Sequence, residues 1–244
     1  MTRSQDWFID WFDSPYYDLL YKNRDENEAR VFLDNLLKYL KLGSNIKVLD
    51  LACGKGRHSK ILSEHVQEVV GLDLSQRKIE FAQGLSNSNL KFVRHDMRKP
   101  FPSGPYRVIF NLFTSFGYFK NENEHLATLE NCCSALEEGG VFVMDFLNIE
   151  YVRNNANQKE VKEQDGISFI IEKKLQNGYL HKSISFNADG KHYQFQERIR
   201  AYSKEDLHDM LSKVKLNIAA LFGSYQLEQF DTLNSERLIL IARK

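Results

Sequence analysis

This sequence of 244 residues lacks several features that would assign a protein to a specialised class. No apolar run approaches the roughly 20 residues that cross a bilayer, and the opening MTRSQDWFID has no basic and then apolar signal pattern. It also lacks an excess of charge, because 33 Lys and Arg residues balance 33 Asp and Glu residues. Without a net positive field to attract polyanions, nucleic acid is not an expected partner. We therefore expect a cytoplasmic protein that binds neither membranes nor nucleic acid.

Cysteine is scarce as well. The three cysteines, Cys53, Cys132 and Cys133, form no CxxC pair, and no HxE or HExxH sequence occurs. These absences leave no readable zinc site and no disulfide framework. We predict free thiols and no metal, and helical spacing with Leu126 and Leu129 predicts that Cys133 lies in the core.

What the sequence does contain is a pattern of short apolar runs alternating with amphipathic stretches. Hydrophobic residues at 42% and charged residues at 27% are typical of a folded globular chain. The alternation predicts an α/β fold with a mostly parallel sheet. The predicted strands are residues 46–51, 68–73, 90–94, 107–112, 141–146, 216–222 and 236–242. A helix over 29–40 precedes them, and Ser75 and Ser203 are predicted helix N-caps.

Two regions depart from this alternation. Residues 167–175, 179–187 and 193–201 are separated by Asn-Gly and Asp-Gly, which are strong hairpin turns, so they predict a three-stranded antiparallel meander. The segment before residue 22 is unusually aromatic, and it either packs on the body or a partner subunit or forms a lid over a ligand. Its aromatic residues are Trp7, Phe8, Trp11, Phe12, Tyr16, Tyr17 and Tyr21. We expect three parts: a helical and aromatic cap at 1–45, an α/β domain at 46–150 and 202–244, and an inserted β subdomain at 151–201.

A glycine turn and three acids suggest a ligand site. The string VLDLACGKGRHS leads from the first strand through Gly54 and Gly56 into a helix, and glycines there let the backbone approach a ligand closely. Asp50, Asp73 and Asp96 lie near the ends of three successive strands, spaced close to the roughly 20 residues typical of a ribose-binding acid. Each acid alone could equally be a helix N-cap. Together they would line the carboxyl edge of the sheet, where open α/β folds bind ligands.

The details of this turn separate alternative ligands. A dinucleotide-binding turn would have a third glycine where this chain has Ser59. Asp50 would repel a pyrophosphate but suits a cationic amino group. A nucleotide triphosphatase is disfavoured because no GxxxxGK[ST] sequence occurs.

These motifs, in this order, resemble those of the class I S-adenosylmethionine-dependent methyltransferases. The resemblance rests on VLDLACGKGRHS, on GLDLS at 71–75, on RHDM at 94–97, on VIFNLFTSFGYF and on GGVFVMDF, and the ending SERLILIA extends it. It implies a Rossmann-like, doubly wound, mostly parallel seven-stranded sheet with an antiparallel last strand. The strings ERIRAYSKEDLHDML and SFGYF are further similar to bacterial small-molecule members, including amino-sugar N,N-dimethyltransferases and glycine-type N-methyltransferases.

The resemblance implies that the cofactor is S-adenosylmethionine, with S-adenosylhomocysteine as product. Asp50 would approach its amino group, Asp73 would accept both ribose hydroxyls, and Asp96 would accept the adenine amino group. The other residues that the resemblance assigns to the cofactor are Ala52, Gly54, Gly56, Leu74, Met97 and Asn111. Arg57 is assigned to the methionine carboxylate, although a solvated surface arginine is the alternative.

Methyl transfer needs a nucleophile held in line with the methyl group. Tyr118, in the SFGYF string, is the candidate for orienting it. The candidate bases for a hydroxyl or phenol acceptor are His95, His58, His192 and Tyr118 itself. We expect a methyltransferase acting on a small molecule, for instance an amine. The alternative is a catalytically inactive S-adenosylmethionine-binding regulatory or assembly protein. The meander would wall the acceptor pocket or form a subunit interface, so a homodimer stays open.

Overall fold

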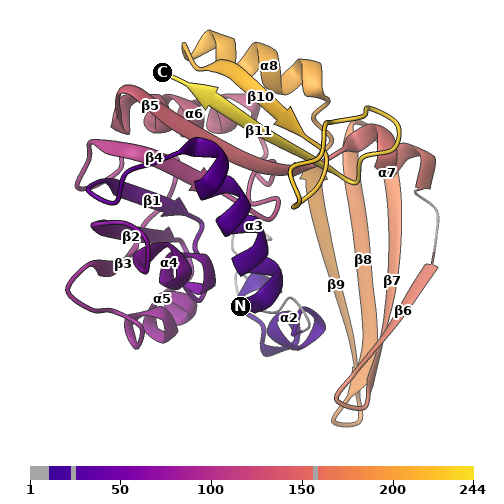
Figure 1. Cartoon of the computed structure of the whole chain (residues 1–244). Helices are drawn as coiled ribbons and strands as arrows, with labels where there is room; N and C mark the ends of the chain where they lie inside the picture. Colours follow the sequence, from indigo (N-terminus) through magenta and orange to yellow (C-terminus); the bar gives the residue numbers. More distant parts are fainter. Residues whose placement is uncertain (1–10, 23–25, 156–158) are drawn as a thin grey trace.

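The computed structural model describes residues 11–22, 26–155 and 159–244 (Figure 1). In the described part of the chain, no helix is long and apolar enough to cross a membrane. Trp7 and Phe8 of the aromatic segment lie outside the described residues.

A seven-stranded sheet forms the centre of the fold, in the order β10-β11-β5-β4-β1-β2-β3. Its strands are β1 (Lys47–Leu51), β2 (Glu68–Asp73), β3 (Leu90–Arg94), β4 (Tyr106–Asn111), β5 (Leu136–Leu147), β10 (Asn217–Phe222) and β11 (Arg237–Arg243). The last strand, β11, runs antiparallel to both of its neighbours, whereas the pairs formed by β1 to β5 are parallel. The predicted α/β fold with an antiparallel last strand is therefore confirmed.

Helices cover both faces of this sheet (Figure 1). On one face are α3 (Glu26–Leu40), α4 (Arg57–Ser63) and α5 (Gln76–Gln83), and on the other are α6 (Glu122–Ala135) and α8 (Lys204–Lys213). Successive residues of a central strand face opposite sides of the sheet. Val48 therefore packs in the core under α3, α4 and α5, and Leu49 packs in the core under α6 and α8. Because β1, β2 and β4 are parallel, their carboxyl ends share one edge of the sheet.

The predicted N-caps are confirmed, whereas the predicted core position of Cys133 is met only in part, because its side chain is partly buried against the core. Ser75 Oγ accepts a hydrogen bond from Lys78 N, and Ser203 Oγ accepts one from Asp206 N. Cys132, not Cys133, is fully buried on α6. The buried stripe of α6 is displaced by one residue because it also takes in the polar side chains of His125 and Thr128, which a purely apolar pattern does not reveal.

The inserted sheet has four strands rather than the predicted three. They are β6 (Lys159–Gln164), β7 (Ile167–Gln176), β8 (Tyr179–Ala188) and β9 (Lys191–Arg200), paired antiparallel in that order. Both predicted hairpin turns are present, with positive φ at each residue. The extra strand, KEVKEQ, was missed because it is an edge strand with a single apolar side chain. The helix α7 (Ile149–Asn155) leads into this sheet, and the division of the chain into domains stays a prediction.

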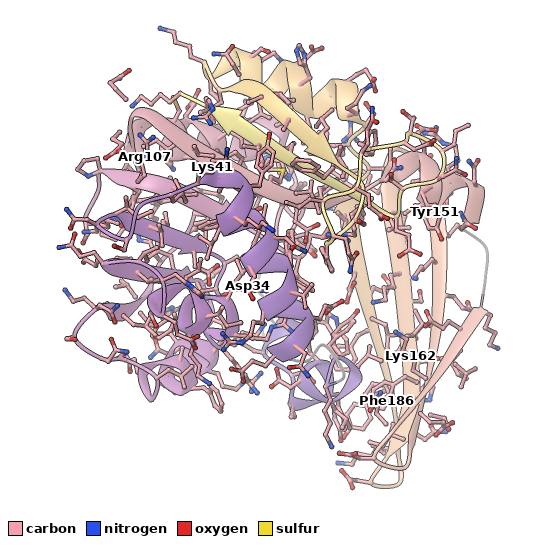
Figure 2. The ribbon with its side chains drawn as sticks, in the orientation of Figure 1. Asp34, Lys41, Arg107, Tyr151, Lys162 and Phe186 are labelled. Carbon is pink, nitrogen blue, oxygen red and sulfur yellow. The ribbon has the colours of Figure 1, made fainter. Side chains whose placement is uncertain are left out.

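The segment 11–22 bridges the two sheets. Its short helix α2 (Pro15–Leu20) lies between α5 and the inserted sheet (Figure 1). Trp11 and Leu20 are buried against Phe169 and Phe186, and Figure 2 marks Phe186 on this part of the inserted sheet. Toward the seven-stranded sheet, Asp18 forms ion pairs with Lys55 and Arg77.

Candidate active site

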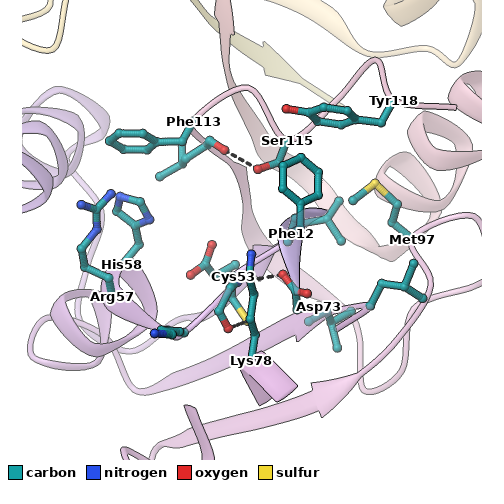
Figure 3. A pocket seen from close by; sticks show the side chains of 18 of the residues that line it. Phe12, Cys53, Arg57, His58, Asp73, Lys78, Met97, Phe113, Ser115 and Tyr118 are labelled. Carbon is teal, nitrogen blue, oxygen red and sulfur yellow. Dashed lines mark hydrogen bonds between the residues drawn. The ribbon is translucent and has the colours of Figure 1, made fainter. Parts of the chain in front are cut away.

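A cavity of about 390 Å³ lies at the carboxyl edge of the seven-stranded sheet. The loops after β1, β2, β3 and β4 line it, together with the segment 11–22 (Figure 3). This is the edge at which an open α/β sheet binds its ligand.

The glycine turn forms the floor of this cavity. Ala52, Gly54 and Gly56 all have positive φ values of 64°, 58° and 82°. A Cβ on Gly54 would meet no atom within 4 Å, so the turn is open toward the cavity there. Gly56 faces the protein instead, because a Cβ on it would lie 2.5 Å from Cζ of Phe92. The two glycines therefore serve different purposes: one leaves space for a ligand, and the other lets α4 pack closely on β3.

Asp50 is a buried carboxylate at one end of the cavity. It is 1% exposed and accepts a hydrogen bond from Ser59 Oγ at 2.5 Å. Burial raises its pKa to about 6, and Asp73 adds to the shift, while Ser59 and Arg57 oppose it. A cationic group placed beside Asp50 would remove this cost, since an opposite charge stabilises the ionised carboxylate.

Asp73 anchors the glycine turn. Its Oδ2 accepts Gly54 N and its Oδ1 accepts Ser75 N, both at 2.8 Å. Each oxygen retains a lone pair, so the carboxylate can accept further hydrogen bonds from the cavity. Lys78 lies beside it, and Figure 3 shows the lysine side chain rising toward the cavity. Burial lowers the pKa of Lys78, and the neighbouring Asp73 opposes that shift.

Asp96 lines the cavity but is already bound by Arg98. The guanidinium Nε and Nη2 lie 2.8–3.1 Å from its oxygens, and Arg98 N donates to Oδ1 at 3.0 Å. Burial raises the pKa of Asp96, but the bonds and charge of Arg98 outweigh it, so this pKa lies below its usual value. Any ligand contact at Asp96 would be added to an existing ion pair.

The structure brings most of the predicted site residues together. The predicted residues that line the cavity are Asp50, Ala52, Gly54, Arg57, Asp73, Leu74, Asp96, Met97 and Tyr118. Gly56 and Asn111 are not among the lining residues. Asn111 is buried, its Nδ2 donates to Leu51 O at 3.2 Å, and its Oδ1 has no hydrogen-bond partner within the described residues. It therefore lies behind the wall of the cavity.

Of the three candidate histidine bases, two lie at the cavity and one does not. His58 and His95 line it. The His58 ring lies 4.9 Å from the Phe113 ring at a tilt of 31°, and burial lowers its pKa to about 3, so it is neutral and weakly basic. His192 is exposed on β9, bonded to Asn187, and lines neither this cavity nor its neighbour.

A second, larger cavity of about 840 Å³ adjoins the first. Its walls come from α7, from the inserted sheet and from the loop between β10 and β11. Charged side chains of both signs line it: Glu28, Lys173, Lys182, Glu197, Glu228, Glu236 and Arg237. Five residues line both cavities, and all are aromatic: Phe12, Tyr17, Tyr21, Phe113 and Tyr118.

Comparison with known proteins identifies the family. A family model described as a methyltransferase domain matches residues 42–188. The chain belongs to this family. It is a class I S-adenosylmethionine-dependent methyltransferase, as the resemblance predicted, and its cofactor is S-adenosylmethionine.

Relatives of this methyltransferase support the same assignment. It is 26% identical over 232 residues to the putative methyltransferase YqeM of Bacillus subtilis, covering 90% of this chain and 94% of that protein. It is 29% identical over 133 residues to dTDP-3-amino-3,4,6-trideoxy-alpha-D-glucopyranose N,N-dimethyltransferase of Streptomyces venezuelae, covering 53% of this chain and 54% of that protein.

Solved structures share the fold of this methyltransferase. An S-adenosylmethionine-dependent methyltransferase from Clostridium acetobutylicum superposes with a TM-score of 0.78 at 21% identity, covering 93% of this chain and 95% of that one. CalS10, an S-adenosylmethionine-bound amino pentose methyltransferase from Micromonospora echinaspora, gives a TM-score of 0.73 at 16% identity, covering 95% and 98% of the two chains.

Sequence reasoning assigned no role to Lys78, which lines the methyltransferase's first cavity. Lys78 lies one turn into the helix that Ser75 begins. In the sequence, only its place shortly after the strand-end Asp73 could have indicated that it lines the cavity. Phe12, Tyr17 and Tyr21 belong to the aromatic segment, for which packing and a lid were the two interpretations. Packing describes Trp11 and Leu20, which are buried on the inserted sheet, whereas Phe12, Tyr17 and Tyr21 line the cavities; the lid stays a prediction.

Proposed function

We propose that this enzyme methylates an amine on a small polar molecule, with S-adenosylmethionine in the first cavity and the acceptor in the second. The observation that carries the proposal is the junction between the cavities, where all five shared residues are aromatic. Aromatic ring faces attract sulfonium and ammonium groups, at about 0.5–2 kcal/mol each. The junction is therefore suited to the passage of a methyl group from a cationic donor to an amine.

The first cavity offers a donor set that fits the cofactor. In this proposal Asp50 holds the amino group, Arg57 the carboxylate and Asp73 the ribose hydroxyls. Leu74 and Met97 provide apolar contacts for the adenine, Asp96 receives its amino group, and the turn from Ala52 to Gly56 passes beneath. Asn111 is no longer assigned a direct contact, because it does not line the cavity.

The cofactor supplies a methyl group on a cationic sulfur, which leaves as a neutral thioether when the nitrogen–carbon bond forms. The chain's own contribution is to orient the acceptor and to exclude water. An amine needs only to lose its proton before attack, so no strong base is required. The low pKa of His58 fits this scheme, because a neutral, weakly basic imidazole suits packing rather than proton removal.

The names of two relatives support an amine acceptor. The Streptomyces venezuelae enzyme is named for N,N-dimethylation of an amino sugar, and CalS10 is described as an amino pentose methyltransferase. The charged and polar walls of the second cavity fit a polar acceptor of that general kind.

A panel of amines tests the proposal. The protein is incubated with methyl-labelled S-adenosylmethionine and, separately, with glycine, sarcosine, nucleotide-linked amino sugars and their hydroxy analogues, and the products are read by mass spectrometry. We expect at least one amine to carry the label on its nitrogen, and we expect none of the hydroxy analogues to be labelled. Label on oxygen alone would refute the amine assignment. No label from any acceptor, with S-adenosylhomocysteine still bound, would favour the catalytically inactive binding protein.

Cofactor binding should depend on pH through Asp50. Its pKa of about 6 in the free protein means that the carboxylate is ionised above pH 6 and mostly protonated below it. A protonated Asp50 loses its attraction for the cofactor's ammonium group, so affinity falls as pH falls. We expect S-adenosylhomocysteine to bind about tenfold more weakly at pH 5 than at pH 7 by calorimetry. Asp50→Asn should bind weakly at both pH values, and a wild-type pH dependence in that variant would contradict the assignment.

Methyl transfer is predicted to survive chelation. Within residues 11–22, 26–155 and 159–244, no group of three His, Cys, Asp or Glu side chains is arranged to hold a metal ion. Treatment with EDTA followed by gel filtration should therefore leave the transfer rate to the labelled amine unchanged. A loss of rate that magnesium or zinc restores would show that the chemistry needs a metal.

A further inference from the structure

The turn after β4 has an unusual backbone where the two cavities meet. Phe113 and Thr114 have φ values of 55° and 58°, so two successive residues with a Cβ occupy the left-handed region. That region is unfavourable for such residues, and it persists only where the surroundings hold it. Phe113 lines both cavities and Thr114 lines the second.

One buried residue, Asp145, holds both amides of this turn, one through its carboxylate and one through its backbone carbonyl. Asp145, at the end of β5, has no exposed surface. Its Oδ2 accepts a hydrogen bond from Phe113 N at 2.9 Å, and its backbone carbonyl accepts Thr114 N at 2.9 Å. The two amides of the turn are thus satisfied by a single residue.

Arg237, the first residue of β11, completes the arrangement. Its Nε and Nη2 lie 2.8 and 2.6 Å from Asp145 Oδ1, and Nη2 donates to Thr114 Oγ1 at 2.9 Å. Tyr225, from the loop that walls the second cavity, donates from its hydroxyl to Asp145 Oδ2 at 3.3 Å. Because a carboxylate buried without a partner is costly, Arg237 and Asp145 depend on each other.

The Phe113 side chain of this turn contacts two residues of the first cavity. The Phe113 ring lies 4.8 Å from the Arg57 guanidinium and 4.9 Å from the His58 ring, both of which line the first cavity. Figure 3 shows Phe113 beside these two residues, with Tyr118 beyond Ser115. A relaxed turn would displace Phe113, which lines both cavities, and so change the border between them.

We propose that Asp145 and Arg237 are positioning residues for methyl transfer, which hold the 113–114 turn so that its side chains border the path between the cavities. The proposal rests on the proposed function, because it takes this junction as the place through which the methyl group passes. Asp145 lines neither cavity and acts only through the turn, while Arg237 lines the second cavity and acts in this scheme through its contacts with Asp145 and Thr114.

The test compares two cofactor analogues by calorimetry. S-adenosylhomocysteine lacks the methyl group, whereas sinefungin carries an ammonium-bearing carbon where the sulfur and its methyl would be. Only sinefungin therefore reports on the junction. Two variants are used: Arg237→Lys, which loses the paired contact with Asp145, and Thr114→Val, which keeps the charge pair and removes only the acceptor of the Nη2 bond.

Both variants are expected to bind sinefungin about fivefold to tenfold more weakly relative to S-adenosylhomocysteine than the wild-type protein does. The double variant should lose less than the product of the two single effects, because both changes break the same contact. Arg107→Lys is the matched control: Arg107 pairs with Glu137 at the opposite edge of the sheet, and its ratio should stay at the wild-type value.

If Asp145 and Arg237 had only a structural role, the variants would weaken the binding of both analogues equally, and the ratio of sinefungin to S-adenosylhomocysteine affinity would stay at the wild-type value. An unchanged ratio in both variants would therefore overturn the proposal.

The binding test does not depend on the identity of the methyl acceptor. If no amine is methylated but the ratio still falls, the positioning role stands and the amine assignment fails. If an amine is methylated and the ratio is unchanged, the amine assignment stands and the positioning role fails.

Discussion

Replacing Asp73 by alanine is expected to weaken S-adenosylhomocysteine binding by about thirtyfold or more. In the proposed site the carboxylate accepts both ribose hydroxyls, and a hydrogen bond to a charged group contributes about 1.5–3 kcal/mol. Allowing for non-additivity, the loss of two such bonds corresponds to at least this factor in affinity. Calorimetry on the purified variant measures it directly.

The structure adds a second reason for a large effect. Asp73 also accepts Gly54 N and Ser75 N, so alanine would leave two backbone donors of the cavity floor without their acceptor. Asp73→Asn separates the two contributions, because its amide oxygen can keep one backbone contact; we expect a loss between those of wild type and alanine. Asp209→Ala, at an acid with a 76% exposed side chain on α8, is the control. If Asp73→Ala bound S-adenosylhomocysteine with wild-type affinity, the cofactor could not be placed in this cavity.

The sheet and the cofactor turn could be predicted from sequence because their signals are local. A buried parallel strand is a continuous apolar run, and the glycine turn and strand-end acids fall within single stretches such as VLDLACGKG and GLDLS. The strands β2 and β3 have the predicted bounds, and β1 and β4 differ by one residue at their ends. Where the signal weakens, as in the polar edge strand β6, the prediction failed.

The junction between the cavities could not be predicted, because it is assembled from distant segments. Phe12 comes from the N-terminal segment, Phe113 follows β4, and the residues that hold the turn, Asp145 and Arg237, lie on β5 and β11. In the sequence Asp145 is one acid at the end of an apolar strand, and nothing in its neighbours indicates a buried ion pair. Positive φ at two non-glycine residues has no sequence signature either, since Phe and Thr disfavour it.

Tyr118→Ala is expected to lower the rate of methyl transfer about a hundredfold while cofactor affinity changes little. Tyr118 lines both cavities and meets the Phe12 ring edge to face, with centroids 5.2 Å apart at 89°. We propose that it orients the acceptor, and a displacement of about 1 Å between nucleophile and methyl can cost that factor in rate. Tyr118→Phe keeps the ring and its packing on Phe12, so it should lose only the contribution of the hydroxyl, roughly threefold to tenfold.

The two substitutions together distinguish alignment from simple packing. If the ring only filled space, phenylalanine would behave as wild type and alanine would weaken cofactor binding and transfer alike. If the residue aligns the acceptor, the single-turnover rate with a labelled amine falls in the order wild type, phenylalanine, alanine, while S-adenosylhomocysteine affinity stays within about twofold, a change of under 1 kcal/mol. A wild-type single-turnover rate in Tyr118→Ala would place the acceptor away from Tyr118, and the second cavity would then lose its proposed role, because Tyr118 lies on its border with the first.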